Sequence, residues 1–204
     1  MISNALQNLF EDTILVCSGA VYAEQESDLH NDISANAWER FKNVTGLKPP
    51  AKIIDVGCGM GVGLRLFSAD GFEAHGLTTS AEEIAALSER FTVFPWDFHE
   101  VARFSKVYDA AWVRHAAEHS FAPFMLLRGV RAALKDGGFL YFEVPGPDTA
   151  CSHESNVSHF SVMGETMWRS LLARSGFQLL DAFKIDLRVQ AGDDIYTGAI
   201  CRAI

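Results

Sequence analysis

Residues 53–64, with the sequence IIDVGCGMGVGL, constrain the fold more than any other stretch of the chain. An aliphatic run leads into Asp55, and glycine then occupies every second position, at residues 57, 59, 61 and 63. Glycine loses more conformational entropy on folding than any other residue, so this spacing indicates that the backbone passes close to a bulky group. A strand, a glycine-rich turn and a helix in succession are typical of the nucleotide-binding crevice of an open α/β sheet.

The spacing of these glycines excludes two common nucleotide-binding motifs. A dinucleotide fingerprint needs GxGxxG, but Val62 or Leu64 stands where its third glycine would be. A triphosphate-binding loop needs a GK[ST] ending, which this stretch lacks. The pattern that remains is DxGxGxG, formed by Asp55, Gly57, Gly59 and Gly61.

Strand-like and helix-like segments alternate along most of the chain, as in a parallel sheet wrapped by helices. The expected strands cover residues 51–56, 72–77, 91–95, 107–113 and 139–145. The expected helices cover 61–69, a segment capped by Ser80 with Glu83 three residues on, Pro123 to about Leu134, and 163–175. Two final strands, joined by a turn at Gly192–Asp193, predict an antiparallel strand at the end of the sheet.

These elements predict an α/β fold with a Rossmann-like, doubly wound sheet that is mostly parallel and has an antiparallel C-terminal strand. A length of 204 residues is in keeping with a single domain. Within it, we expect residues 1–45 to form an N-terminal helical lid and residues 46–204 to form the cofactor-binding core. Residues 146–161 form a long polar loop, and such loops in compact domains usually carry function.

Composition limits the partners that the protein can bind and indicates the cellular compartment in which it works. A formal net charge of −9 argues against nucleic acid and against an anionic membrane surface, because both are bound by Lys and Arg. Four cysteines are scattered without a CxxC pair, which predicts reduced thiols in a cytoplasmic protein. Residues 13–23 resemble the apolar part of a signal peptide, but Glu11 and Asp12 precede them where a signal has positive charge. No apolar run is long enough to span a bilayer.

The glycine turn resembles the first motif of the class I S-adenosylmethionine-dependent methyltransferases. YDAAWVRHAAEHS, at residues 108–120, is similar to the fourth strand and following loop of that family. ALKDGGFLYFEVP, at 133–145, resembles its LKPGG turn and fifth strand. SHFSVMGETMWRSLLARSGF, at 158–177, is similar to a stretch found in members that act on small molecules. The resemblance covers residues 51–176 and implies a seven-stranded fold that binds S-adenosyl-L-methionine and releases S-adenosyl-L-homocysteine.

The resemblance also implies which residues meet the cofactor. Asp55 would orient the loop, and Arg114 would approach the methionine portion mainly through its backbone. Asp97 would meet the adenine amino group with Phe98 beside the ring, although Asp97 could instead be a helix N-cap. The residues that would face the cofactor from the glycine turn are Gly57, Cys58, Gly59 and Gly61.

The second strand departs from the family pattern. Such enzymes usually end this strand with an acid that binds both ribose hydroxyls, whereas the aligned residue here is Thr78. A neutral hydroxyl lacks the strength of a charge-assisted bond. We therefore expect Thr78 and Thr79 to contact the ribose with reduced affinity.

Histidines follow the fourth and fifth strands, at residues 115, 119, 153 and 159. Their unperturbed pKa lies near neutrality, which suits the removal of a proton from a methyl acceptor. Loops at the carboxyl ends of parallel strands meet above the ligand site, so these two groups should converge. The candidate catalytic residues are His115, Glu118, His119 and His159. Glu118 and His119 could instead form a structural pair, and His159 could anchor its loop.

Residues 115–119, HAAEH, also match the HxxEH pattern of inverted zinc proteases. That motif needs a sustained helix, whereas a strand precedes this stretch and Pro123 starts a new helix soon after it. We therefore assign no metal site from the sequence. A divalent metal held by these histidines and Glu118 to bind an oxygen substrate stays open as an alternative.

Motifs of nucleic-acid methylation are missing. RHAA occupies the place of an N/D-P-P-aromatic motif after the fourth strand, and the sequence contains no Pro-Cys nucleophile. The chain is therefore expected to methylate an O, N or C atom of a small molecule. The alternative is a cofactor-binding or scaffold protein of the same fold without turnover.

Overall fold

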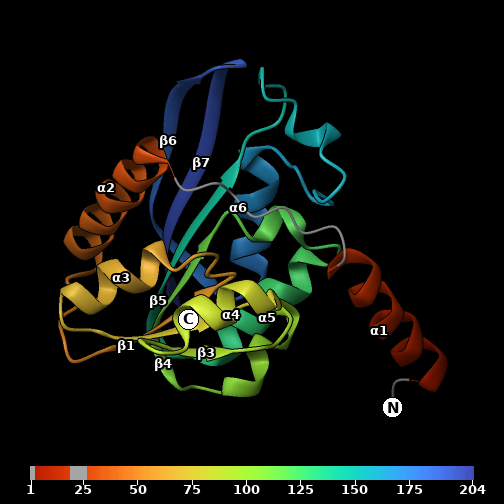
Figure 1. Ribbon diagram of the computed structural model, residues 1–204, viewed down its shortest axis with the longest axis horizontal. Coiled ribbons are helices and arrows are strands. Elements are labelled where there is room, and N and C mark those ends of the chain that lie inside the picture. Colours follow the sequence, from red (N-terminus) through yellow and green to blue (C-terminus); the bar gives the residue numbers. More distant parts are fainter. Residues whose placement is uncertain (1–2, 19–26) are drawn as a thin grey trace.

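The computed structural model describes residues 3–18 and 27–204, in which seven strands form one mixed sheet of order β3–β2–β1–β4–β5–β7–β6 (Figure 1). Strands β1 to β5 are parallel, whereas β7 is antiparallel to both β5 and β6. The predicted doubly wound fold is confirmed, with β7 inserted so that the sheet ends on β6. The strands are β1 (Lys52–Val56), β2 (Glu73–Leu77), β3 (Thr92–Phe94), β4 (Tyr108–Arg114), β5 (Leu134–Pro145), β6 (Phe177–Val189) and β7 (Gly192–Ala203).

Helices cover both faces of this sheet (Figure 1). Helices α2 and α3 pack on one face, and α5, α6 and η1 pack on the other. No helix in the described ranges is long and apolar enough to cross a membrane. The α-helices are α1 (Asn4–Ser18), α2 (Asp28–Thr45), α3 (Val62–Ala69), α4 (Ala81–Leu87), α5 (Pro123–Ala133) and α6 (Glu165–Arg174), and the short 3₁₀ helices are η1 (Phe98–Phe104), η2 (Ala117–His119) and η3 (His153–Ser155).

The central strand β1 is apolar on both faces because both faces are covered. Ile53 packs with Trp38 and Phe67 in one layer, and its neighbour Ile54 packs with Leu126 in the other. Successive side chains of a strand point to opposite faces, so a buried parallel strand reads as a continuous apolar run. This arrangement leaves the carboxyl end of β1 directed at the glycine turn.

Helix α2 is part of the core. It begins after Ser27, whose hydroxyl accepts a hydrogen bond from the backbone N–H of His30, and ends at Gly46 with φ +64°. Trp38 and Phe41 are 2% and 1% exposed and pack against the sheet. The expectation that residues 1–45 form a lid is therefore wrong for most of α2. It can hold only for the first turn of α2 and for the residues before this helix. Residues 19–26, which belong to the expected lid, lie outside the described residues.

Helix α1 extends away from the body of the molecule (Figure 1). Leu15 and Val16 are 73% and 74% exposed. Phe10 contacts the sheet domain, with its ring 5.9 Å from that of His99 and 5.3 Å from that of Phe121.

The C-terminal hairpin turns two residues earlier than predicted. Val189 pairs with Gly192, which leaves Gln190 and Ala191 in the turn. A Cβ atom on Gly192 would lie 2.6 Å from Ala150 Cβ, so this glycine allows residues 146–161 to pack against the hairpin. The backbone N–H of Ala150 donates to the carbonyl of residue 193 at 3.1 Å, which holds the two segments together.

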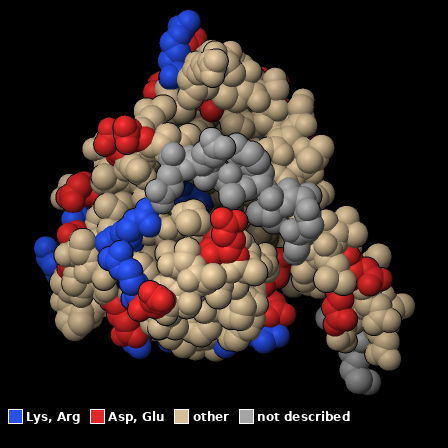
Figure 2. All heavy atoms as spheres, in the orientation of Figure 1, with Lys and Arg blue, Asp and Glu red and all other residues tan. Residues whose placement is uncertain are grey.

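Both signs of charge occur in small groups over the face of the molecule shown in Figure 2. Several acidic side chains lie beside basic ones, as in the ion pairs Lys52–Glu73 and Lys106–Asp136. An interspersed surface of this kind is typical of soluble domains.

Candidate functional site

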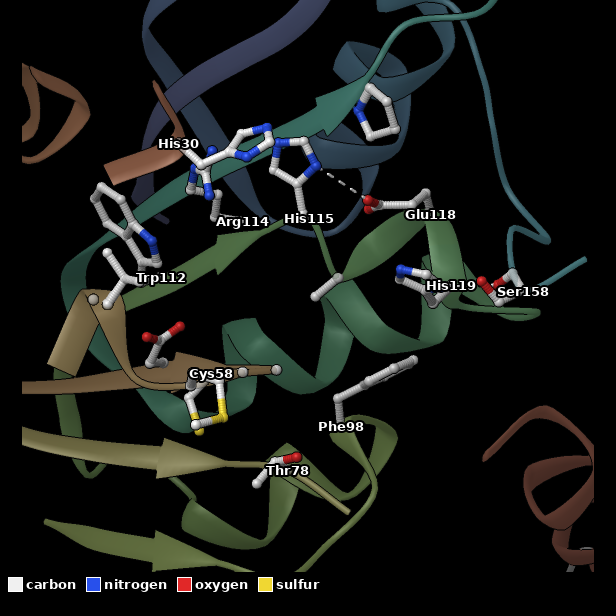
Figure 3. A pocket seen from close by; sticks show the side chains of 18 of the residues that line it. His30, Cys58, Thr78, Phe98, Trp112, Arg114, His115, Glu118, His119 and Ser158 are labelled. Atoms are coloured by element: carbon white, nitrogen blue, oxygen red, sulfur yellow. Dashed lines mark hydrogen bonds and ion pairs between the residues drawn. The ribbon is translucent and has the colours of Figure 1, made fainter. Parts of the chain in front are cut away.

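A cavity of about 590 Å³ lies at the carboxyl ends of β1, β2, β4 and β5. Ligands bind at this edge of open α/β sheets because the loops that leave the strands gather there. The cavity wall combines the glycine turn, the end of β2, the start of η1, the loop after β4 and residues 151–159 (Figure 3). Of the site residues predicted from the sequence, all but Gly61 line this cavity.

The glycines of the turn have different surroundings. Gly59 has φ +50°, and a Cβ atom there would meet nothing within 4 Å, so its flank opens into the cavity. Gly57 lies against Ala116, with 3.0 Å between the two Cβ positions. Gly61 does not face the cavity as expected, because its own Cβ position lies 2.6 Å from Leu87. Gly59 is therefore the position where the backbone leaves room for a ligand.

Asp55 braces the turn from the end of β1. Its side chain is buried, and a Cβ atom on Gly63 would lie 2.4 Å from Asp55 Oδ2, so the carboxyl packs on the first turn of α3. Burial raises the pKa of Asp55 to about 7, although the positive charge of Arg114 acts in the opposite direction. This geometry agrees with the orienting role that the resemblance implies.

At the end of β2, the carboxylate comes from the next helix. The Thr78 hydroxyl donates to Glu83 Oε2 at 2.5 Å and accepts from the backbone N–H of Ser80 at 3.1 Å. Glu83 is 7% exposed and lines the cavity with Thr78 and Thr79. The predicted cap by Ser80 is present, but the Glu83 side chain turns toward Thr78 and not back to the start of α4. Glu83 thus places a buried acid where the family pattern expects one from β2.

Asp97 is both a helix cap and part of the cavity wall. Its Oδ1 accepts from the backbone N–H of His99 at 2.9 Å and lies 2.7 Å from His99 Nδ1. The other ring nitrogen of His99 lies 2.7 Å from the Ser120 hydroxyl, so the histidine is fixed at both ends. Phe98 lines the cavity beside Asp97, as expected.

Arg114 ends β4 and is held by a buried acid on β5. Its Nε lies 2.8 Å from Glu143 Oε1, and the Tyr141 hydroxyl donates to the other oxygen of Glu143. Burial alone would raise the pKa of Glu143, but the hydrogen bond to His115 and the charge of Arg114 hold it below its ordinary value. The sequence offered a signal for Glu143, since it is the one acid within the apolar run FLYFEVP.

His115 lies between two buried carboxylates, those of Glu118 and Glu143, and Figure 3 shows the one of Glu118 facing it. Its Nε2 is 3.1 Å from Glu143 Oε1, and its Nδ1 is 3.6 Å from Glu118 Oε1. The residue has φ +50°, a conformation that side chains other than glycine rarely adopt, and its backbone N–H donates to the carbonyl of Glu143 at 3.0 Å. Strained positions of this kind cluster at functional sites.

The two groups of histidines converge as predicted. The rings of His119 and His159 are 4.7 Å apart, and those of His153 and His159 are 5.8 Å apart. His119 Nδ1 lies 2.9 Å from the carbonyl oxygen of Ser158, and His159 Nδ1 lies 3.0 Å from that of His153. Burial lowers the pKa of His159 to about 4, and the neighbouring histidines act in the same direction.

The sequence analysis placed His153 among the converging histidines but missed Asp194, Tyr196, His30 and Asn31, which also line the cavity. His153 Nε2 lies 3.0 Å from both carboxylate oxygens of Asp194, which is 2% exposed on β7. From the first turn of α2, the His30 ring reaches the Tyr196 hydroxyl at 3.3 Å. Asn31 adds a buried side-chain oxygen with no hydrogen-bond partner among the described residues. No local motif marks these positions, because only the tertiary fold brings them to the cavity.

The cavity fits S-adenosylmethionine. Gly59 leaves an open flank, Glu83 and Asp97 place two acids at neighbouring strand ends, and the Asn31 oxygen, which has no hydrogen-bond partner within residues 3–18 and 27–204, can accept from a ligand. A volume of about 590 Å³ lies within the usual range for small-molecule and cofactor sites. The fold and the site together define a cofactor-binding α/β domain of the class I methyltransferase type.

Comparisons with known proteins agree with that class. The family model described as "Methyltransferase domain" matches residues 28–182. A search of curated proteins gave no significant match. The chain therefore belongs to this methyltransferase domain family; it is a class I methyltransferase enzyme with S-adenosylmethionine as its cofactor.

Solved structures share the fold at low sequence identity. An S-adenosylmethionine-dependent methyltransferase from Archaeoglobus fulgidus superposes with a TM-score of 0.68 at 17% identity, covering 84% of this chain and 94% of the other. One from Methanosarcina mazei gives 0.65 at 15% identity, covering 78% and 94%. The Burkholderia thailandensis 1,6-didemethyltoxoflavin-N1-methyltransferase, solved with 1,6-didemethyltoxoflavin and S-adenosylhomocysteine, gives 0.65 at 17% identity, covering 90% and 93%.

Proposed function

We propose that the enzyme methylates an O, N or C atom of a small molecule. The acceptor must enter a cavity of about 590 Å³ whose wall is made of titratable side chains. The Burkholderia neighbour, which has the same fold, binds a small molecule together with S-adenosylhomocysteine. The net charge of −9 further disfavours nucleic acid as the acceptor.

The residues of the β1–β3 edge would hold the cofactor. S-Adenosylmethionine supplies a methyl group on a positively charged sulfur. The Gly59 backbone would give it room, Glu83 would accept from the ribose hydroxyls and Asp97 would accept from the adenine amino group, because all three residues line the cavity. Arg114, which is held by Glu143, would present a fixed positive charge to the methionine carboxylate.

The position of His115 carries the proposal for the chemical step. An imidazole that bonds to Glu143 through Nε2 keeps Nδ1 as the atom able to take a proton from the acceptor. The cation formed would lie between Glu143 and Glu118, much as a buried carboxylate stabilises an imidazolium in hydrolase triads. A positioned general base is typically worth ~10²–10⁴-fold in rate.

The remaining expectations complete the proposal. The first two turns of α2, with His30, Asn31 and Ser34, would form a side wall of the acceptor site. Cys17, Cys58, Cys151 and Cys201 are all free thiols, which supports a reducing, cytoplasmic compartment.

Calorimetry and an acceptor screen test this function. Purified enzyme should bind S-adenosylmethionine and S-adenosylhomocysteine with one site per chain. A library of hydroxyl, amine and activated-carbon acceptors is then incubated with the methyl donor and analysed for a mass gain of one methyl group. Tight binding without turnover on any acceptor would favour the scaffold alternative, and turnover only on RNA or protein would overturn the small-molecule assignment.

A further inference from the structure

Two histidines and one acid form a compact group in the cavity wall beside His115. One potential ligand atom from each of Glu118, His119 and His159 lies within 4.8 Å of the other two. We propose that these three side chains bind one divalent transition-metal ion, with Zn²⁺ as the best match, and leave a coordination position open to the cavity. The site goes beyond the proposed methyl transfer, because its occupancy can be measured without cofactor or acceptor.

Both imidazoles are held in the tautomer that a metal requires. His119 Nδ1 lies 2.9 Å from the carbonyl of Ser158, and His159 Nδ1 lies 3.0 Å from that of His153. A carbonyl only accepts, so in each ring Nδ1 carries the proton and Nε2 keeps its lone pair. Metal-binding histidines almost always donate their second ring nitrogen in this way.

Glu118 supplies the oxygen ligand. It is 1% exposed, and a carboxylate buried to this extent needs compensating charge or hydrogen bonds. A dication would add to the compensation that His115 already gives Glu118, and it would also offset the nearby carboxylate of Glu143. Two histidines and a glutamate are an established ligand set for Zn²⁺, with the fourth position left for water or substrate.

The two segments that carry the ligands are tied together by the backbone. The carbonyl oxygen of Glu118 accepts from the N–H groups of Phe160 and Ser161 at 2.8 and 2.9 Å. The Ser161 hydroxyl donates to the carbonyl of Ser120 at 2.6 Å. The loop that carries His159 is thereby fixed next to Glu118, which keeps the group preorganised.

One existing contact would have to change when the ion binds. The Asn156 Nδ2 lies 3.3 Å from His159 Nε2, at the long end of hydrogen-bond distances. Asn156 Oδ1 accepts from the backbone and the hydroxyl of Ser158, which fixes the amide with its NH₂ toward the histidine. Asn156→Asp keeps these bonds and replaces the NH₂ donor with a carboxylate oxygen that can serve as a fourth ligand, so this substitution should tighten metal binding.

A second group, Cys151, His153 and Asp194, also has ligand atoms within 4.8 Å of one another. Its atoms are already committed, because His153 Nε2 lies 3.0 Å from both Asp194 oxygens and bonds them through its proton. A metal there would have to displace that proton and break the bonds. This second group therefore serves as the internal control.

The test is metal titration of the full chain after chelator treatment. Zn²⁺ is followed by calorimetry and Co²⁺ by its visible absorption, which reports nitrogen and oxygen ligation directly. We expect one ion per chain, at least tenfold weaker binding in Glu118→Gln and His119→Ala, and tighter binding in Asn156→Asp. His75→Ala, a histidine outside the cavity that contacts Tyr108, and Asp194→Asn should bind as the unaltered enzyme does.

Several results would overturn the metal site. These are the absence of one-to-one binding, unchanged affinity in both Glu118→Gln and His119→Ala, and loss of binding in Asp194→Asn with retention in the other two. Circular dichroism shows which variants are folded, and Asn156→Asp remains informative if a ligand variant unfolds. Failure of methyl transfer in the acceptor screen would leave the metal titration unaffected.

Discussion

The two halves of the cavity are built in different ways. The half at β1–β3 consists of turns whose residues are close in sequence, as in the glycine turn and the Thr78–Glu83 pair. The half at β4, β5 and β7 consists of side chains from distant segments, such as His153 and Asp194, which are 41 residues apart. A half built from local turns can bind the same cofactor in many proteins, while a half built from distant segments can change with the acceptor. Substitutions in the first half should therefore change cofactor affinity, and substitutions in the second half should change the rate of methyl transfer.

The largest expected effect is on turnover in the β4 half. Replacing His115 removes the base between Glu143 and Glu118, and turnover should fall ~10²–10⁴-fold. His115→Asn is the best variant, because asparagine tolerates the φ of +50° at this position and avoids added backbone strain. Affinity for S-adenosylhomocysteine should change less than about twofold, since the loss falls on the transition state.

Steady-state kinetics with the identified acceptor and calorimetry with S-adenosylhomocysteine measure these two quantities. His30→Asn is the control for a histidine in the α2 wall of the same cavity, and it should act mainly on the Michaelis constant. Full turnover in His115→Asn would show that the acceptor needs positioning only.

The next effect concerns the open flank of the glycine turn. Gly59→Asn tolerates the left-handed backbone but fills the space where the ligand should lie, so cofactor affinity should fall by about 10–100-fold. Gly46→Asn is the matched control. Gly46 is also left-handed, with φ +64°, and a Cβ atom there would also meet nothing within 4 Å, but Gly46 ends α2 away from the cavity.

Calorimetry and thermal unfolding separate the two glycine variants. Both should keep a folded circular-dichroism spectrum, and only Gly59→Asn should lose affinity for S-adenosylhomocysteine. Equal affinities in the two variants would remove the glycine turn from the cofactor site.

The sequence predicted the β1–β3 half well because its signals are local. The DxGxGxG spacing, the cap at Ser80 and the position of Asp97 each act within a few residues, so the pattern carries the geometry. Glu83 was interpreted only as a capping partner because spacing does not tell which way a side chain turns. Gly61 was misplaced for a similar reason, since its contact with Leu87 depends on how α4 packs.

The β4–β7 half was predictable only in outline. The rule that loops gather at the carboxyl ends of parallel strands brought His115, His119 and His159 together correctly. Asp194 was missed because its place depends on the register of the hairpin, whose turn was predicted two residues too late. The prediction would put Asp194 directly beside the turn, whereas Asp194 pairs with Leu187 two residues after the start of β7. Its contact with His153 therefore requires the tertiary structure.

A smaller effect is expected from Glu83. Glu83→Gln keeps the shape and one acceptor but removes the charge, so affinity for S-adenosylhomocysteine should fall by about 1 kcal/mol. Glu82→Gln is the matched control, since Glu82 lies in the same turn and is exposed. Thr78→Asp should also weaken binding, because its carboxylate would lie next to that of Glu83.

A ligand that lacks the ribose hydroxyls sharpens this test. The 2′,3′-dideoxy analogue of S-adenosylhomocysteine should bind the unaltered enzyme more weakly than the parent does. In Glu83→Gln that difference should shrink, because the acid that recognises the hydroxyls is gone. An undiminished difference would assign the ribose to another residue.

The smallest expected effect is a dependence of stability on pH in the β4 half. Burial lowers the pKa of His159 to about 4 in the folded protein, against about 6.5 in the unfolded chain. Between these values the unfolded chain binds more protons, so the free energy of unfolding decreases as pH falls from about 6.5 to about 4. Because the ring is partly exposed, we expect this term to be about 1–2 kcal/mol and not the full value of the shift.

Urea unfolding at pH 7 and pH 5, with a chelator present to exclude metal effects, measures this term. His159→Gln should lose less stability than the unaltered enzyme between the two pH values. His75, whose pKa burial also lowers, is present in both proteins, so its contribution cancels in the difference. If both proteins lose the same free energy of unfolding, His159 is protonated as readily in the folded state as in the unfolded chain. Its packing against His119 and the His153 carbonyl would then not keep the ring neutral. The long-range contacts of the β4 half would in that case position His159 without changing its pKa.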